Sequence, residues 1–178
     1  VVLMHRLDAS NAIVLSPYYG QRHTESFLAG NAFSTNTTQA NGVIDLQRDF
    51  YGLDAKWLHR TEVRGMPLRL VGGIDRNQND DHRLTYGNKA GAPASATATQ
   101  DLDQSARNLD GYAQAELRPS ERLALSAGAR HSRTTLSSTN NNGSVAAPGT
   151  GSHTYQAWNT LLSAQYALRE DTNLYAAY

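Results

Sequence analysis

The chain has 178 residues, of which 39% are hydrophobic and 18% charged, and its formal net charge is +0. This length suits one domain, and the balanced charge gives no electrostatic reason to expect a nucleic-acid partner. The sequence contains no cysteine, which excludes disulfides, thiolate metal sites and cysteine nucleophiles.

Apolar and polar residues alternate with a period of two along much of the chain, which predicts β-strands and not helices. A partial strand over residues 1–7 leads through a turn at 8–11 into a strand that contains Ile13, Leu15 and Tyr19. The sequence has no apolar run of the roughly 18 residues that a transmembrane helix requires.

Two clear hairpins follow along the chain. Residues 51–58 and 66–75 alternate on either side of a tight connection near 61–65. Residues 109–117 and 122–130 alternate on either side of a predicted turn at 118–121, where a proline occupies a position that turns favour. In both hairpins, one set of alternate positions is rich in Leu, Ala and Gly, and the other set carries most of the charged residues.

The last predicted strand covers residues 156–168 and is followed by a turn at 169–172 and an incomplete strand from Asn173. The end of the chain is strand-like and has no loop after it, which favours a segment of a longer protein. Long polar stretches cover residues 30–42, 87–104 and 137–153. Short turns that alternate with long loops are expected of outer-membrane barrels.

A soluble β-sandwich is the main alternative, because its strands also alternate between apolar and polar residues. Three features favour the barrel. The strands around Pro119 exceed the roughly 10 residues that cross a bilayer at a tilt. The apolar positions hold few of the bulky Phe and Ile residues that a sandwich core needs, and the opposite positions are polar enough for a wet lumen. Tyr and Trp near strand ends fit an interfacial girdle, although their strand propensity explains them equally well.

The fold prediction is therefore all-β: an antiparallel up-and-down transmembrane β-barrel segment of about eight strands, two of them truncated. Eight strands could close a small barrel by themselves. The long loops and the polar, Gly-rich second face favour an arc of a larger barrel.

Several segments resemble the mid-barrel of TonB-dependent outer-membrane receptors of the ferric-siderophore type. They are FYGLDAKW at 50–57, PLRLVGGID at 67–75, NLDGYAQAEL at 108–117, LALSAGARHS at 123–132 and NLYAAY at 173–178. The resemblance implies a 22-stranded barrel in the bacterial outer membrane, of which residues 1–178 are a partial β-barrel domain without the plug and the remaining strands. It also implies three partners: outer-membrane lipid, TonB acting through the plug, and an imported small molecule such as a ferric siderophore.

Two groups of side chains are candidate functional residues. The first is a polar wall predicted to face the lumen, where it meets a plug or a charged ligand, or forms cross-strand ion pairs that stiffen the wall. Its members are Asp54, Lys56, Arg69, Asp110, Gln114, Glu116 and Arg130. The second is a ligand-binding group on the outer side, where arginine and tyrosine suit an anionic ferric complex. Its members are Arg76, Arg83 and Tyr86.

Other kinds of site are not indicated by the sequence. The six histidines have no metal-ligand spacing, and the run at 80–82 is better explained as a solvated loop than as a cation site. No arrangement of residues supplies a nucleophile, a base or a cofactor site, so no catalytic, cofactor or metal residues are predicted and an enzyme is not expected. A passive outer-membrane pore, a small structural or adhesive barrel and a soluble β-rich binding module remain as alternatives.

Overall fold

The computed structural model describes residues 1–28, 39–89, 92–93, 96–142 and 149–178. Over these residues the chain forms one antiparallel sheet, whose strands follow one another in chain order from β1 to β9 except that the short β5 pairs only with β4. The strands are β1 (Leu3–Arg6), β2 (Asn11–Phe27), β3 (Gln39–Val63), β4 (Met66–Lys89), β5 (Ala92–Pro93), β6 (Gln100–Ser120), β7 (Leu123–Asn140), β8 (Gly151–Arg169) and β9 (Thr172–Ala177).

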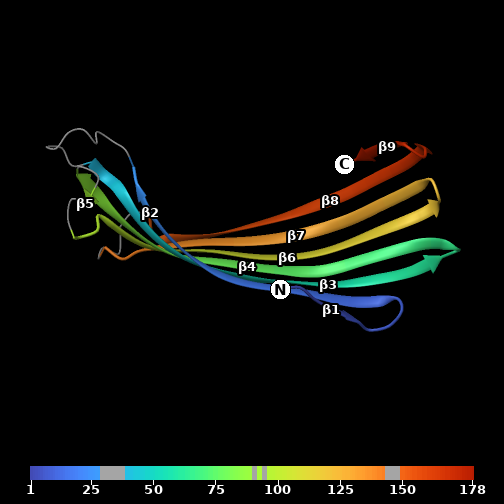
Figure 1. Ribbon diagram of the computed structural model, residues 1–178, viewed down its shortest axis with the longest axis horizontal. Coiled ribbons are helices and arrows are strands. Elements are labelled where there is room, and N and C mark those ends of the chain that lie inside the picture. The colour runs from blue at the N-terminus through green and yellow to red at the C-terminus, as the bar shows by residue number, and fades with distance from the viewer. Residues whose placement is uncertain (29–38, 90–91, 94–95, 143–148) are drawn as a thin grey trace.

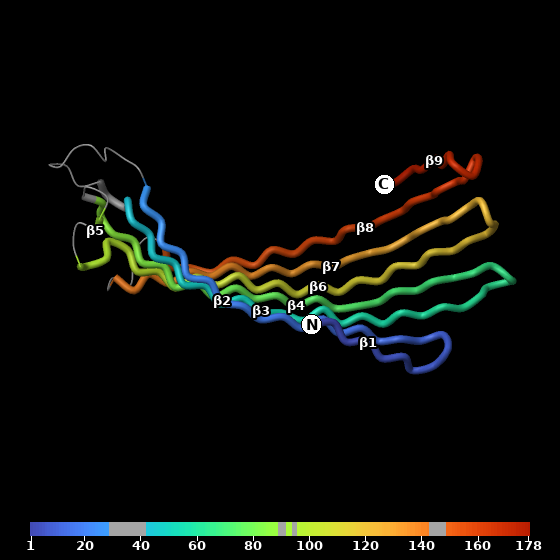
Figure 2. The backbone as a smooth tube through the Cα atoms, in the orientation of Figure 1, coloured from blue at the N-terminus to red at the C-terminus, as the bar shows by residue number. Residues whose placement is uncertain are grey.

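This architecture confirms the predicted all-β antiparallel meander. None of the described residues lies in a helix long and apolar enough to cross a membrane. The turns after β3, β6 and β8 lie together at one end of the sheet, and β5 lies at the other end (Figure 1). β1 and β9 form the two edges, with β1 alongside β2 and β9 alongside β8 (Figure 2).

The tight hairpin between β3 and β4 is closed by the pair Val63 and Met66. Its two central residues, Arg64 and Gly65, have φ angles of 54° and 76°. Two successive left-handed residues form the type I′ turn, whose twist matches that of the flanking strands. The turn lies inside the connection that the sequence predicted near 61–65.

Two sequence predictions need correction. The turn predicted at 118–121 lies further along the chain, because β6 continues to Ser120 and only Glu121 and Arg122 connect it to β7. Pro119 lies instead where the β6–β7 register shifts between Leu117 and Ser120. A proline has no N–H to donate, so an irregular stretch of pairing accommodates it better than a regular ladder.

The long loops were also predicted too long. Strands occupy residues 39–42, 87–89, 100–104, 137–140 and 151–153 within the stretches predicted as loops. The rest of these stretches includes residues 30–38, 90–91, 94–95 and 143–148, which lie outside the described residues. β3 is 25 residues long and β4 is 24, more than twice the 9–11 residues of a membrane-crossing strand.

The register gives the sheet two chemically different faces. Residues that pair directly across strands share a face, and one such row joins Trp57, Gly72, Ala113, Ala129 and Thr160. We call this side the apolar face. It exposes large side chains that include Leu53 at 40%, Ile74 at 56%, Leu109 at 51%, Trp158 at 72% and Leu162 at 58%. The other side, the polar face, carries Asp54, Asp75, Asp110 and Ser132 in a single row.

The apolar zone runs obliquely across these rows. One row near the loop end begins with Tyr19 and Tyr51 and finishes with Thr135 and Thr154 on β7 and β8. In a row near the turn end the apolar residues lie instead toward β8: Ala164, Leu125, Leu117 and Leu68 are apolar, and Thr61 on β3 is polar. From β2 to β8 the apolar zone therefore moves toward the short turns.

Candidate functional site

Hydrogen bonds join side chains of five strands across the polar face. The Tyr18 hydroxyl on β2 donates to the side-chain oxygen of Asn77 on β4, at 2.5 Å. The Tyr112 hydroxyl on β6 donates to Asp54 on β3, at 3.2 Å. The Thr134 hydroxyl on β7 donates to Asn108 on β6, at 2.7 Å. These contacts connect strands that are next to each other or one strand apart, so they oppose sliding within the sheet.

All seven residues of the predicted polar wall lie on this face. Six of them form three ion pairs: Lys56 with Asp54 at 3.0 Å, Arg69 with Glu116 at 4.0 Å, and Arg130 with Asp110. The Asp110 carboxylate is only 1% exposed and also accepts a hydrogen bond from Asn108 at 2.8 Å. Gln114 is exposed on the same face. The geometry supports the ion-pair interpretation of these residues, and their orientation toward a lumen remains a proposal.

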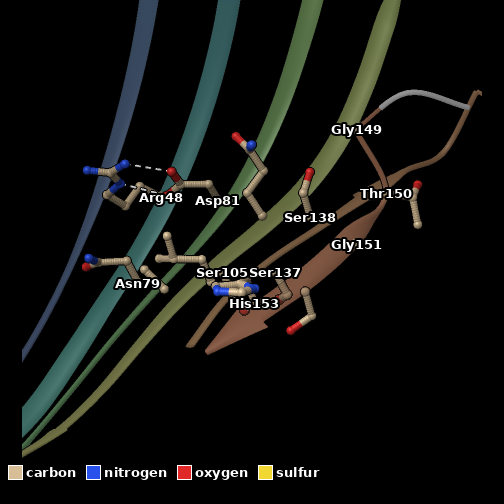
Figure 3. A pocket seen from close by; sticks show the side chains of 14 residues that line it. Arg48, Asn79, Asp81, Ser105, Ser137, Ser138, Gly149, Thr150, Gly151 and His153 are labelled. Carbon is tan, nitrogen blue, oxygen red and sulfur yellow. Dashed lines mark hydrogen bonds and ion pairs between the residues drawn. The ribbon is translucent and has the colours of Figure 1, made fainter. Parts of the chain in front are cut away.

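A hollow of about 550 Å³ lies at the loop end of the sheet (Figure 3). Polar-face residues of β3, β4, β6, β7 and β8 supply most of its lining. The side chains around it combine a charged pair, amides, hydroxyls and one imidazole over a small apolar surface: Arg48, Asp81, Asn79, Gln104, Ser138, Thr150, His153, Ala106 and Leu136.

The charged pair in this hollow is held by two hydrogen bonds. The Arg48 Nε and Nη2 atoms donate to the two carboxylate oxygens of Asp81, both at 2.6 Å. This hydrogen bonding holds the pKa of the Arg48 guanidinium above its usual value. Arg48 remains 34% exposed, so its N–H groups that do not bond Asp81 are accessible from the hollow. These remaining N–H groups can donate hydrogen bonds to an oxygen-rich group in the hollow.

The three predicted ligand residues do not form one site. All lie on β4, but Arg83 is on the polar face and Arg76 and Tyr86 are on the apolar face. Arg76 and Tyr86 are ten positions apart, which corresponds to about 33 Å along a strand. Among the three, only Arg83 shares a face with the hollow. Their ligand binding stays a prediction, and the residues of the hollow were missed because only the strand register brings them together.

The acidic and histidine residues near the loop end are also separated by the two faces. Asp81 points to Arg48 on the polar face, and His82 on the opposite face contacts Asp103 at 2.8 Å. One cluster that the sequence did not indicate is formed by His23, Glu25 and Asp45, whose potential ligand atoms all lie within 4.8 Å of one another. His23 and Glu25 are exposed, and His23 already hydrogen-bonds Asp45 at 2.8 Å. This exposed contact explains the cluster without an ion.

Comparison with known protein families gives one match. The family model described as "TonB dependent receptor-like, beta-barrel" matches residues 4–178.

Comparison with solved structures gives the same architecture. The unliganded ferric citrate transporter FecA has 15% sequence identity and a TM-score of 0.81, over 98% of this chain and 25% of FecA. The open form of the ferric-catecholate import receptor Fiu from E. coli K12 has 12% identity and a TM-score of 0.70, over 98% of this chain and 33% of Fiu. The copper transporter OprC has 14% identity and a TM-score of 0.62, over 98% and 28%. At these identities the likeness shows the fold alone.

Proposed function

This chain belongs to the TonB-dependent receptor family, and on that premise we propose that it forms part of the wall of an outer-membrane β-barrel that imports a scarce nutrient. The similar solved proteins are transporters and receptors and not enzymes. The chain spans about a quarter to a third of their length. In this proposal, residues 1–178 are an arc of the barrel, and a plug and further strands complete the receptor.

The observation that carries the proposal is the contrast between the two faces. A broad zone of Leu, Ile, Ala and Trp side chains is exposed on one face, which in water would cost about 25 cal/mol for every Å² left uncovered. Lipid covers such a zone without cost, whereas the ion pairs of the other face suit a wet interior. We therefore assign the apolar face to outer-membrane lipid and the polar face to the lumen.

The proposed substrate is a ferric siderophore, and TonB acts through the plug. Two of the similar structures carry ferric substrates in their names, and one carries copper. Ferric siderophore complexes are commonly anionic chelates rich in oxygen. Arg48, His153 and the amides of the hollow offer hydrogen-bond donors to such a surface.

Growth rescue by the full-length gene tests the import function. A strain without its own siderophore receptors is grown under iron limitation with one ferric siderophore at a time, in TonB-positive and TonB-negative backgrounds. The expected result is rescue only where TonB is present. Rescue without TonB would contradict the receptor and favour a passive pore. A parallel series under copper limitation tests whether the imported metal is iron or copper.

Arginine variants test which face meets the ligand. Removal of the guanidinium from the polar face, in Arg48→Ala or Arg83→Ala, is expected to weaken siderophore binding about ten-fold or more, as for the loss of one charge-assisted hydrogen bond. Arg76 is also a predicted ligand residue, so Arg76→Ala, which removes the same charge from the apolar face, decides between that prediction and the assignment of faces. Equal losses in Arg76→Ala and Arg83→Ala, measured by fluorescence quenching on the intact receptor, would refute the assignment of faces.

A further inference from the structure

Three arginines lie close together on the apolar face, at the loop-end border of the exposed apolar zone. Arg76 on β4 and Arg133 on β7 pair with the two sides of Leu109 on β6, so all three residues lie in one row. Arg107, two residues before Leu109 on β6, lies in the next row toward the loop end. Two strand spacings separate the backbones of Arg76 and Arg133, which is about 10 Å.

The three guanidinium groups are free to bind another molecule. All three residues are exposed, and none of them takes part in an ion pair with a described residue. Arg76 and Arg107 are both close enough to the Tyr51 hydroxyl to act on it electrostatically. Elsewhere on the sheet, arginines such as Arg48, Arg118 and Arg130 have acidic partners.

Acidic residues of the same face lie further toward the loop end and bind other groups. Asp80 accepts hydrogen bonds from Tyr51 at 3.2 Å and from Gln78 at 2.8 and 2.9 Å. Asp49 accepts from Gln21 at 2.8 Å, and Asp103 is bonded to His82 and to Asn141, each at 2.8 Å. The arginines therefore form a separate cationic band between the apolar zone and these carboxylates.

The side chains on the turn-end side of this cationic band are apolar and aromatic, so the band lies at the border of the exposed apolar zone. The next row of this face toward the turn end contains Ile74, Gly111, His131 and Trp158. The ring centroids of His131 and Trp158 are 4.8 Å apart. Trp158 is 72% exposed and Ile74 is 56% exposed. Tryptophan rings and arginine stems both suit the border between hydrocarbon and lipid headgroups, where a guanidinium can reach the polar layer.

We propose that Arg76, Arg107 and Arg133 form a binding site for the phosphate groups of a lipid headgroup in the leaflet on the long-loop side. The site rests on the proposed membrane location of the apolar face. A guanidinium binds phosphate oxygens through two parallel N–H donors, and three such groups without carboxylate partners give a site of net positive charge. The lipid chains would then lie against Leu109, Ile74 and Trp158, directly below the phosphate.

Lipid-binding measurements on the full-length receptor in an uncharged detergent test this site. The probe is bisphosphorylated lipid A, and the comparison probe is the same lipid without its phosphates. The test variant is R76Q/R107Q/R133Q. The conservative variant changes the same three arginines to Lys, and the matched control is R60Q/R64Q/R122Q, which removes three exposed arginines at the short-turn end.

The site predicts a clear order of affinities. Each basic residue near a charged membrane surface is expected to contribute roughly five-fold to the affinity, so the triple Gln variant is expected to bind bisphosphorylated lipid A roughly a hundred-fold more weakly. The Lys variant keeps the three charges but not the paired donors, so it is expected to bind more weakly than the parent and more tightly than the Gln variant. The turn-end control is expected to stay within a few-fold of the parent. Heat-dependent gel mobility checks that the barrel of each variant is closed. If the triple variant does not fold, lipid A binding is measured with R107Q alone.

Three results would overturn the site: unchanged affinity in the Gln variants, equal binding of the dephosphorylated lipid, or displacement of lipid A by inorganic phosphate at similar concentration. The last result would assign the patch to free phosphate. TonB-dependent growth of the same strains is measured in parallel. If the Gln variants lose lipid binding and growth does not depend on TonB, the lipid site is supported and the proposed import function is refuted. If the Gln variants keep lipid binding and growth depends on TonB, the lipid site is refuted and the import function is supported.

Discussion

At the residue scale, aromatic rings on the polar face lie over glycines of the neighbouring strand. Tyr112 pairs directly with Gly73, and a Cβ atom at Gly73 would lie 2.6 Å from the Tyr112 ring and 2.9 Å from the backbone oxygen of Ala55. Gly73→Ala is expected to displace the ring from its hydrogen bond with Asp54 and to cost about 1–3 kcal/mol, as overpacking does. Unfolding of the full-length receptor by denaturant measures this loss.

The adjacent glycine provides the control. A Cβ atom at Gly72 meets only the Tyr112 backbone oxygen, at an ordinary 3.8 Å. Gly72→Ala is expected to leave the unfolding midpoint nearly unchanged. A loss of the same size in both variants would indicate a general cost of replacing strand glycines and not a clash with Tyr112.

The pKa of His82 is expected to depend on the pairing of β4 with β6, because His82 lies directly opposite Asp103 in that pairing. The His82 imidazole donates a hydrogen bond to the Asp103 carboxylate, which holds the His82 pKa above the usual value near 6.5. The contact therefore stabilises the folded sheet fully below about pH 6.5, and the stabilisation is lost as the pH rises through the raised pKa of the folded state. NMR titration of labelled histidine should show the pKa of His82 falling in Asp103→Asn. An unchanged pKa would contradict the contact.

Sequence alternation was sufficient to place the polar-wall residues on one face, because alternation in a strand depends only on parity. It could not show that Arg130 meets Asp110, that Arg48 meets Asp81 or that Arg83 is turned away from Arg76. Two of these facts depend on the register between strands, and the third on whether β4 continues as a regular strand through a stretch predicted as loop. Register and strand continuity are set by contacts between segments distant in the sequence.

At the element scale, the β3–β4 hairpin depends on two left-handed residues. Gly65 adopts its φ of 76° without steric cost, whereas a side chain there meets its own backbone. Gly65→Ala is expected to destabilise the receptor by about 1 kcal/mol, and Arg64→Asn is expected to be neutral or slightly stabilising because asparagine tolerates this conformation. Refolding from urea into detergent compares the two. Equal effects of both substitutions would argue against the type I′ turn.

Element boundaries were predicted well at the turns after β1, β3 and β8, and poorly at the turn after β6 and at the loop end. The turns after β1, β3 and β8 have local signals, such as Asp8, whose carboxylate accepts the backbone N–H groups of Ser10 and Asn11. Beyond the apolar zone, both faces of the strands are polar, so the two-residue pattern that marks a strand disappears although the backbone pairing continues. Sequence reasoning therefore mistook extended polar strands for loops.

At the scale of the whole molecule, the sheet has open edges. β1 covers only residues 12–15 of β2, and β9 pairs only with the turn-end part of β8. Residues 16–27 of β2 and 151–161 of β8 thus have a row of backbone groups unpaired by any described strand. Residues 1–178 expressed alone and refolded in detergent are expected to self-associate through these edges, whereas the full-length receptor stays monomeric. A monomeric, heat-modifiable fold of the isolated chain, seen by light scattering and gel mobility, would contradict this expectation.

With the apolar face in the outer membrane, as proposed above, the oblique course of the apolar zone also sets how far the receptor extends out of that membrane. The centre of the zone moves by about five residues over the five strand-to-strand steps from β2 to β8, or roughly 17 Å along the strands for 24 Å across them. The strands are thus inclined by about 35°, in the range usual for outer-membrane barrels. At that inclination a straight strand of 25 residues, the length of β3, would rise about 70 Å, against an apolar belt of about 25 Å. Most of the strand length that exceeds the apolar belt lies on the long-loop side, where it forms a hydrogen-bonded collar. The receptor would therefore contact a nutrient well beyond the lipid headgroups.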